Sequence, residues 1–269
     1  MKLLTLNTHS LEEKAMRVKQ VEFVKAIAAL DPDVIALQEV NQTFAADDMQ
    51  EPSARPGVPF REDNHAYMLH QLMKQQGLRY EMVWLPVKTG YSRYDEGLAF
   101  FTKKKILEVR STLLSQQDDY DDFRTRRSLE VKTEDGWFVN VHMGWWNDAL
   151  EPFAGQWKKL AKALPQNEPV YVLGDFNADA QVRGEGYDLV RASGFFDLYE
   201  EAQAKDDGMT VVQEIDGWRE GDHPKKMRID HLFSSRPVAV ASCRTVFNGI
   251  NEPVISDHFG LMAIVNPVE

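Results

Sequence analysis

The stretch YVLGDFNADA, Tyr171–Ala180, decides the fold prediction for this chain. It begins with apolar and aromatic residues that favour a buried strand. The strand is followed at once by Asp175 and Asn177, residue types that turns also prefer, so a plain turn is one interpretation. A charged group at the end of a buried strand costs free energy unless it is paired or binds a metal. The stretch therefore predicts either a tight turn or a strand whose end carries chemistry.

The rest of the chain supplies nine further short segments rich in Val, Ile, Leu and Phe, which predict strands. Helical periodicity is present in three other segments, and Asn64 is a predicted N-cap. Three long polar segments predict loops. The ten predicted strands are residues 2–6, 33–38, 80–87, 97–102, 128–133, 137–143, 170–174, 229–235, 238–246 and 259–265; the helices are 12–30, 64–77 and 154–164; and the loops are 41–63, 113–127 and 204–227.

Composition restricts the class of protein and its partners. The 269 residues are 43% hydrophobic and 27% charged, which is ordinary for a protein with a large core. All three loops lie between strands, so a single domain over residues 1–269 is expected. No run of 18 apolar residues and no signal peptide is evident, which predicts a cytoplasmic protein with no membrane partner. The net charge of −11 makes nucleic acid an unlikely partner. The oligomeric state is not predicted.

Six of the apolar segments carry or abut carboxylates, amides or imidazoles. One such residue means little, but six segments that end in this way point to a shared site. The residues are Asn7, His9, Glu39, His142, Asp175, Asn177, Asp230, Asp257 and His258.

The order of these residues along the chain resembles that of the endonuclease/exonuclease/phosphatase superfamily. The motifs that carry the resemblance are TLNTHS, LQEV, VHM, GDFN, RIDH and SDH, and they extend over nearly the whole chain. The resemblance implies an α/β (α+β) fold, a four-layer sandwich in which two mostly antiparallel mixed β-sheets pack face to face with helices on the outside. It also implies a divalent metal at one end of the sandwich, and hydrolysis of phosphoester bonds by activated water without a covalent enzyme intermediate.

The residue types agree with a Mg²⁺ site, with Mn²⁺ as a possible substitute. Mg²⁺ prefers oxygen ligands and is commonly held by one or two carboxylates, so Glu39 is the first predicted ligand. Asn7 would offer an amide beside it, and Asp257 a second carboxylate. His9 occupies a position that is often an acid or amide elsewhere in the family, so both one metal and two metals remain open.

The resemblance assigns catalytic roles to four further positions. Asp175 would orient or deprotonate the attacking water, and Asn177 would donate to the phosphoryl oxygens. His142 and His258 would stabilise the charge of the transition state or protonate the leaving oxygen. Asp230 resembles the acid that orients the final histidine, here His258.

Weaker matches concern the pancreatic deoxyribonuclease branch of the superfamily. Glu96 resembles the acid that pairs with the middle histidine, here His142. Tyr94 and Arg127 stand at the phosphate-contact positions of that branch.

Four functions compete for this site: a small-molecule phosphomonoesterase, a nuclease, a sphingomyelinase-like phosphodiesterase, and a binding protein that kept the site unused. The excess of acidic over basic residues favours a small phosphorylated substrate over a nucleic acid. The absence of a segment in which basic and aromatic residues alternate favours the same class of substrate. Trp145 and Trp146 could stack on a sugar, or one or both could be packing residues. The segments NTHS, YDEGLAFF, HMGWW and GDFNA also resemble cytoplasmic sugar-phosphate phosphatases of this superfamily, such as maltose 6'-phosphate phosphatase.

Overall fold

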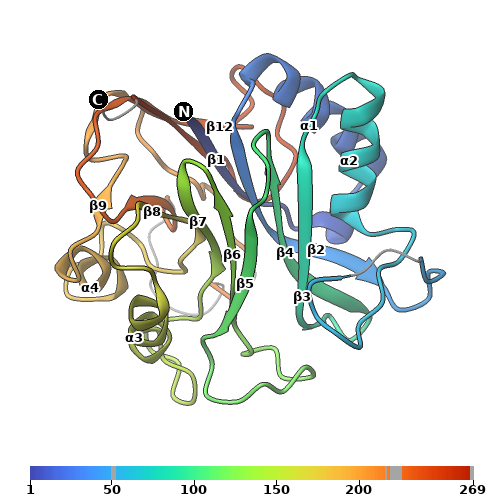
Figure 1. Cartoon of the computed structure of the whole chain (residues 1–269), viewed down its shortest axis with the longest axis horizontal. Helices are drawn as coiled ribbons and strands as arrows, with labels where there is room; N and C mark the ends of the chain where they lie inside the picture. The colour runs from blue at the N-terminus through green and yellow to red at the C-terminus, as the bar shows by residue number, and fades with distance from the viewer. Residues whose placement is uncertain (50–52, 216, 219–225, 267–269) are drawn as a thin grey trace.

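Two β-sheets form the centre of the computed structural model, which describes residues 1–49, 53–215, 217–218 and 226–266 (Figure 1). The seven-stranded sheet has the order β10-β12-β13-β1-β2-β4-β3, and the six-stranded sheet has the order β5-β6-β7-β8-β11-β9. Among the strands of the described residues, β1–β2, β10–β12 and β7–β8 are parallel pairs and the other pairs are antiparallel. The strand bounds are β1 Lys2–Asn7, β2 Val34–Thr43, β3 Glu81–Gly90, β4 Tyr94–Thr102, β5 Glu108–Leu113, β6 Arg127–Thr133, β7 Gly136–His142, β8 Val170–Asp175, β9 Phe196–Asp197, β10 Ala202–Lys205, β11 Asp230–Ser234, β12 Val240–Val246 and β13 Gly260–Val265.

Side-chain alternation along the strands produces three apolar layers. In β1, Leu3 packs in the cluster between the two sheets, whereas Leu4 packs on the opposite face. In β8, Leu173 faces the other sheet and Val172 faces away from it. Successive side chains of a strand point to opposite faces, so each sheet buries both of its faces.

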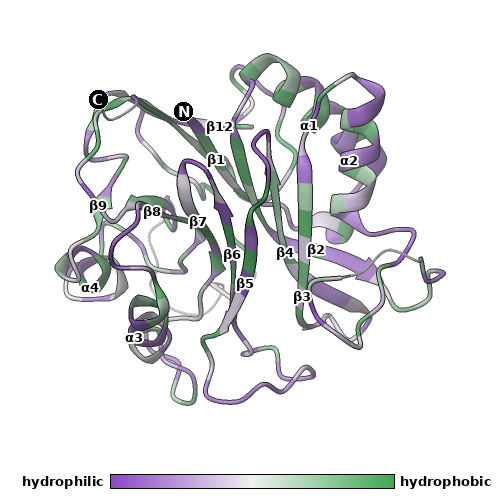
Figure 2. Ribbon diagram, viewed as in Figure 1, coloured by the Kyte–Doolittle hydropathy of each residue, from purple (hydrophilic) through white to green (hydrophobic). Residues whose placement is uncertain are grey.

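Helices cover the outer face of each sheet (Figure 1). The cluster that contains Leu4 lies against α1 (Met16–Leu30) and α2 (His65–Gln75), and the cluster that contains Val172 lies against α3 (Phe153–Ala163) and α4 (Gly186–Ala192). The four-layer sandwich of two mostly antiparallel sheets is therefore confirmed. Figure 2 shows hydrophobic residues along central strands such as β1. No helix among the described residues is long and apolar enough to cross a bilayer.

Several predicted boundaries are wrong, and the residues explain why. The predicted loop 41–63 starts too early, because β2 continues to Thr43. The third predicted loop, 204–227, also starts too early, because β10 continues to Lys205. Strand β5 was missed because it is a sheet edge with mostly exposed residues. Strand β9 has two residues and α4 has seven, too few to show a period. Residues 10–12 form a separate 3₁₀ turn before α1.

The start of α2 is as predicted. The side-chain oxygen of Asn64 accepts a hydrogen bond from the backbone N–H of Tyr67, which satisfies one of the free donors of the first turn.

Candidate active site

Strand register brings the polar strand ends together at one end of the sandwich. In the six-stranded sheet, Asp175 of β8 lies opposite both His142 of β7 and Asp230 of β11. In the seven-stranded sheet, Asn7 at the end of β1 lies beside Gln38 of β2. The two sheets thus present these ends to the same space.

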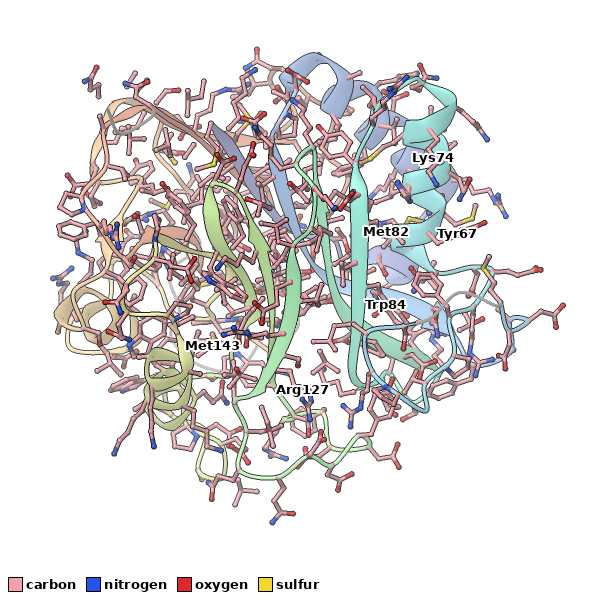
Figure 3. The ribbon with its side chains drawn as sticks, in the orientation of Figure 1. Tyr67, Lys74, Met82, Trp84, Arg127 and Met143 are labelled. Atoms are coloured by element: carbon pink, nitrogen blue, oxygen red, sulfur yellow. The ribbon has the colours of Figure 1, made fainter. Side chains whose placement is uncertain are left out.

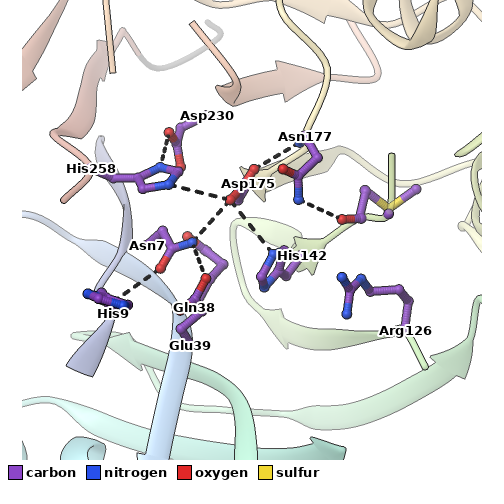
Figure 4. Close-up of polar contacts among 12 residues, drawn as sticks. Asn7, His9, Gln38, Glu39, Arg126, His142, Asp175, Asn177, Asp230 and His258 are labelled. Atoms are coloured by element: carbon purple, nitrogen blue, oxygen red, sulfur yellow. Dashed lines mark hydrogen bonds and ion pairs between the residues drawn. The ribbon is translucent and has the colours of Figure 1, made fainter. Parts of the chain in front are cut away.

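Asp175 is the centre of this group (Figure 4). Its Oδ2 accepts a hydrogen bond from Nδ2 of Asn7 at 3.0 Å, and its Oδ1 accepts one from the backbone N–H of Asn177 at 2.8 Å. Nε2 of His142 lies 3.8 Å from Oδ2, and Nε2 of His258 lies 4.0 Å from it. Burial, together with the charge of Asp230, raises the pKa of Asp175 to about 6.

The histidine pair has two different electrostatic environments. Nδ1 of His258 lies 2.9 Å from Oδ2 of Asp230, the arrangement expected from the sequence. Burial lowers the pKa of His258, but the carboxylates of Asp230 and Asp175 outweigh burial and raise it to about 10. Burial, with the positive charge of Arg126, holds the pKa of His142 well below its usual range. At neutral pH, His258 is therefore a cation and His142 is neutral.

A bulge in β2 directs Glu39 into the same space. The register between β2 and β4 shifts between Leu37 and Val40, and Glu39 has a φ of 51°. Such a backbone is uncommon for a residue other than glycine, and bulges re-aim side chains at active sites. Oε1 of Glu39 accepts the second hydrogen bond of the Asn7 amide at 2.8 Å.

The residues around Glu39 fit a divalent cation. Burial, and repulsion from Glu96 and Asp257, raise the pKa of Glu39 to about 7, which shows several acids gathered close together. A cation would relieve this repulsion, and carboxylate and amide oxygens are the ligands that Mg²⁺ prefers. Potential ligand atoms of Asp175, Asp230 and His258 also lie within 4.8 Å of one another.

These residues line a cleft of about 270 Å³. Of the residues predicted from the sequence, it includes His9, Glu39, Glu96, His142, Trp145, Asp175, Asn177, Asp257 and His258. It also contains residues that the sequence did not single out, namely Lys88, Thr89, Gly90, Tyr91, Phe123, Arg126, Ile215 and Gly217. Asn7 and Asp230 lie behind the cleft wall and hold Asp175, Glu39 and His258 in place.

Arg126, and not the predicted Arg127, reaches the cleft. Arg127, labelled in Figure 3, begins β6 and forms an ion pair with Asp118. Arg126 is 3% exposed, and its Nη1 donates to the carbonyl of Phe123. Within the described residues, no carboxylate lies within 4.0 Å of its guanidinium, and its Nε has no hydrogen-bond partner. Neighbouring residues at the start of a strand point in opposite directions. An error of one residue in the prediction therefore assigned Arg127 to the cleft in place of Arg126.

Two other predicted contacts differ in the structure. Glu96 pairs with Nζ of Lys88 at 2.9 Å across β3 and β4, and no hydrogen bond to His142 occurs among the described residues. Tyr94 is buried, with Arg93 over its ring at 4.9 Å, and lies outside the cleft lining. The hairpin between β3 and β4 places Tyr91 in the cleft instead.

The two neighbouring tryptophans have different surroundings. Trp145 lines the cleft, with Arg126 over its ring at 5.8 Å, and its buried Nε1 has no partner in the described part of the chain. Trp146 packs against Phe153 of α3, with ring centroids 6.3 Å apart. Trp146 thus packs on α3 and does not line the cleft, which is the packing alternative that the sequence left open for one or both tryptophans.

Comparison with known families agrees with this geometry. The endonuclease/exonuclease/phosphatase family model matches residues 4–258. The chain belongs to the endonuclease/exonuclease/phosphatase family. Members of this family are phosphoesterases that generally use divalent metals.

Solved structures of the family extend the comparison. A family protein from Leptotrichia buccalis is 28% identical, with a TM-score of 0.86 over 99% of this chain and 100% of that chain. A mannosyl-6-phosphatase from Bacteroides thetaiotaomicron is 16% identical, with a TM-score of 0.67 over 99% and 100% of the two chains. TDP2 from Caenorhabditis elegans is 17% identical, with a TM-score of 0.63 over 99% of this chain and 71% of that chain. A search of curated proteins returned no significant match.

Proposed function

We propose that this protein is a divalent-metal-dependent phosphomonoesterase that hydrolyses a small sugar phosphate. The observation that carries the proposal is the cleft of about 270 Å³, where Asp175 and His258 meet Arg126, a guanidinium with no carboxylate partner among the described residues. Ligand sites are commonly about 300–1,000 Å³, so this volume suits a small substrate. Arg126 and the cationic His258 supply positive charge for one phosphate group.

The walls and the overall charge favour the same class of substrate. Tyr91, Phe123 and Trp145 give the cleft aromatic faces, on which a sugar could lie. The net charge of −11 repels a long polyanion such as DNA. The mannosyl-6-phosphatase among the similar structures supports a sugar phosphate, although TDP2 has a comparable structural similarity.

The proposed reaction begins with proton transfer to Asp175. A water next to its carboxylate would lose a proton to it as the oxygen attacks phosphorus, and the sugar oxygen would leave with a proton from Nε2 of the cationic His258. Asn7 holds the carboxylate through Oδ2, and the backbone N–H of Asn177 holds it through Oδ1. A divalent cation bound at Glu39 and Asp257 would polarise the phosphoryl group and stabilise the leaving oxygen.

The remaining residues stabilise the negative charge on phosphorus. His258 would donate from Nε2, because its Nδ1 is occupied by Asp230. Arg126 and the free N–H of the Asn177 amide would donate as well, since one amide hydrogen of Asn177 is bonded to the carbonyl of Met143 at 2.9 Å. Donors that are already in position lower the barrier because they need no reorganisation during the reaction.

A substrate panel tests this proposal. Phosphorylated mono- and disaccharides, nucleotides, inositol phosphates, sphingomyelin and plasmid DNA are incubated with the Mg²⁺-loaded protein, and inorganic phosphate is measured. We expect the highest specificity constant for a sugar phosphate. Nicking of DNA at moderate salt, with no phosphate released from any sugar phosphate, would favour a nuclease instead.

The two tryptophans provide a matched control in the same panel. Trp145→Ala should raise KM for the sugar phosphate and spare p-nitrophenyl phosphate, because binding energy from the sugar is lost only where a sugar is present. Trp146→Ala should lower the melting temperature through lost packing on Phe153, with little change in KM. Equal effects of Trp145→Ala on both substrates would remove the sugar-stacking role.

A further inference from the structure

A second cavity lies where the edge strands of the two sheets meet helix α2. Strand β3 ends the seven-stranded sheet, and β5 ends the six-stranded sheet. The cavity is lined by residues of both strands, of α2 and of the segment 53–60, and we call it the edge groove. Its volume of about 580 Å³ exceeds that of the catalytic cleft and lies in the usual range of ligand sites. The two cavities share no lining residue.

One wall of the edge groove is apolar. Met82 and Val83 of β3 line it, and each is only partly buried against a core layer. Val109 of β5 lies opposite Val131, a residue of the layer between the sheets, and is 41% exposed. The open side of the sandwich therefore exposes apolar side chains that a ligand with an apolar body would remove from water.

The other wall is α2, which presents hydrogen-bond donors. Tyr67, Gln71 and Lys74 line the groove, and their spacing of four and three residues places them on one face of the helix. Figure 3 labels Tyr67 and Lys74 on α2 and Met82 on β3, which contacts α2. In the part of the chain that the structure describes, the polar groups of these three side chains have no hydrogen-bond or ion-pair partner. Together they offer more donors than acceptors.

The charge of the edge groove differs from that of the whole chain. The chain has 42 acidic and 31 basic residues, yet none of the described residues that line the groove is acidic. Lys74 supplies one positive charge, which reaches His70 in the same wall. Burial lowers the pKa of His70, and the charge of Lys74 lowers it further, against the effect of the hydrogen bond from its Nε2 to the carbonyl of Tyr80. One cation beside several donors suits a head group that has one negative charge and only acceptor atoms.

We propose that the edge groove binds a small amphipathic carboxylate, with its apolar body on Val83 and Val109 and its carboxylate at Lys74 and Gln71. A ligand with two chemically different ends matches a groove whose two walls differ in the same way. The site goes beyond the proposed function and is independent of it, because it shares no residue with the catalytic cleft.

Calorimetric titration with decanoate, and with decanol as the uncharged probe, tests the head-group contact. We expect one decanoate per wild-type chain and a weaker affinity for decanol. Lys74→Met should weaken decanoate binding at least about threefold, because a charge-assisted contact is lost, and leave decanol binding within about twofold. Lys25→Met is the matched control, since Lys25 pairs with Glu22 on α1 and lies outside the groove. Unchanged decanoate binding in Lys74→Met would show that Lys74 only stabilises the end of the helix, and would overturn the proposal.

Val109→Glu tests the apolar wall. The position is exposed, so the fold should tolerate a carboxylate there, but the binding of decanoate should weaken at least about tenfold through lost apolar contact and repulsion. Leu107→Glu is the matched control, because Leu107 is 56% exposed just before β5 and does not line the groove.

Amide chemical shifts measured by NMR locate the probe. Decanoate should shift the signals of α2 and β3 and leave those of Asp175 and its neighbours unchanged. The absence of saturable decanoate binding, equal affinities for decanoate and decanol, or shifts confined to residues outside the edge groove would overturn the proposal.

Discussion

Replacing Asp175 by Asn should lower kcat at least about a thousandfold, because the change keeps the shape of the side chain and removes the proton acceptor. The backbone N–H of Asn177 can still donate to the remaining oxygen at this position. Far-ultraviolet circular dichroism should therefore be unchanged. The measurement is steady-state hydrolysis of p-nitrophenyl phosphate at pH 7.5.

Asp179→Asn is the matched control for this change. Asp179 is also buried and follows the same strand, but its Oδ1 binds the backbone N–H groups of Gln181 and Arg228 and it does not line the cleft. It should retain activity. Equal losses in Asp175→Asn and Asp179→Asn, with equal losses of folding, would return Asp175 to the role of a turn residue.

The raised pKa of Asp175 also gives the sign of the acid limb of the pH profile. A base with a pKa of about 6 is ionised above that pH and protonated below it, so kcat/KM, which reports the free enzyme, should fall as the pH decreases through about 6. An unshifted aspartate would keep its activity down to about pH 4.

Removal of Asp230 or His258 should reduce kcat by similar factors, about a hundredfold to a thousandfold each, and the double variant should be hardly worse than either. The reason is that Asp230 orients His258 at 2.9 Å and keeps it protonated, so that the two residues act as a pair. Groups that act as one unit are non-additive in this way. The measurement is a double-mutant cycle with Asp230→Ala and His258→Ala. Losses that multiply in the double variant would show that the two residues act separately.

The ion pair of Asp230 with His258 should also be detectable in the pKa of the histidine. The carboxylates raise the pKa of His258 to about 10, so Asp230→Asn should lower it measurably by NMR. The stabilisation that this ion pair gives to the fold is fully present below the unfolded pKa of about 6.5 and is lost as the pH rises through the folded value.

How well the sequence predicted the site depends on what positions each residue. Asp175 and Asp230 were predictable because apolar strands end in carboxylates, and strand ends of neighbouring strands meet. The bulge that aims Glu39 was not predictable, since it requires the pairing of β2 with β4. The same holds for the pairing of Lys88 with Glu96, which is a cross-strand contact.

Arg126 illustrates a different limit. Sequence alone placed a basic residue near the site, but which of two adjacent arginines faces the cleft depends on where β6 begins, and boundaries are the least certain part of a prediction. Its burial without a carboxylate partner among the described residues, on which its proposed contact with phosphate rests, is a property of the folded chain.

The most direct test of the central claim, metal-assisted hydrolysis of a small phosphomonoester in this cleft, is the release of inorganic phosphate from a sugar phosphate before and after metal removal. Protein treated with chelator and then freed of it should release no phosphate above the background of Asp175→Asn. Addition of Mg²⁺ or Mn²⁺ should restore turnover, because Glu39 and its neighbours would again hold a cation. Full turnover by the metal-free protein, equal to that of the Mg²⁺-loaded protein, would contradict the account.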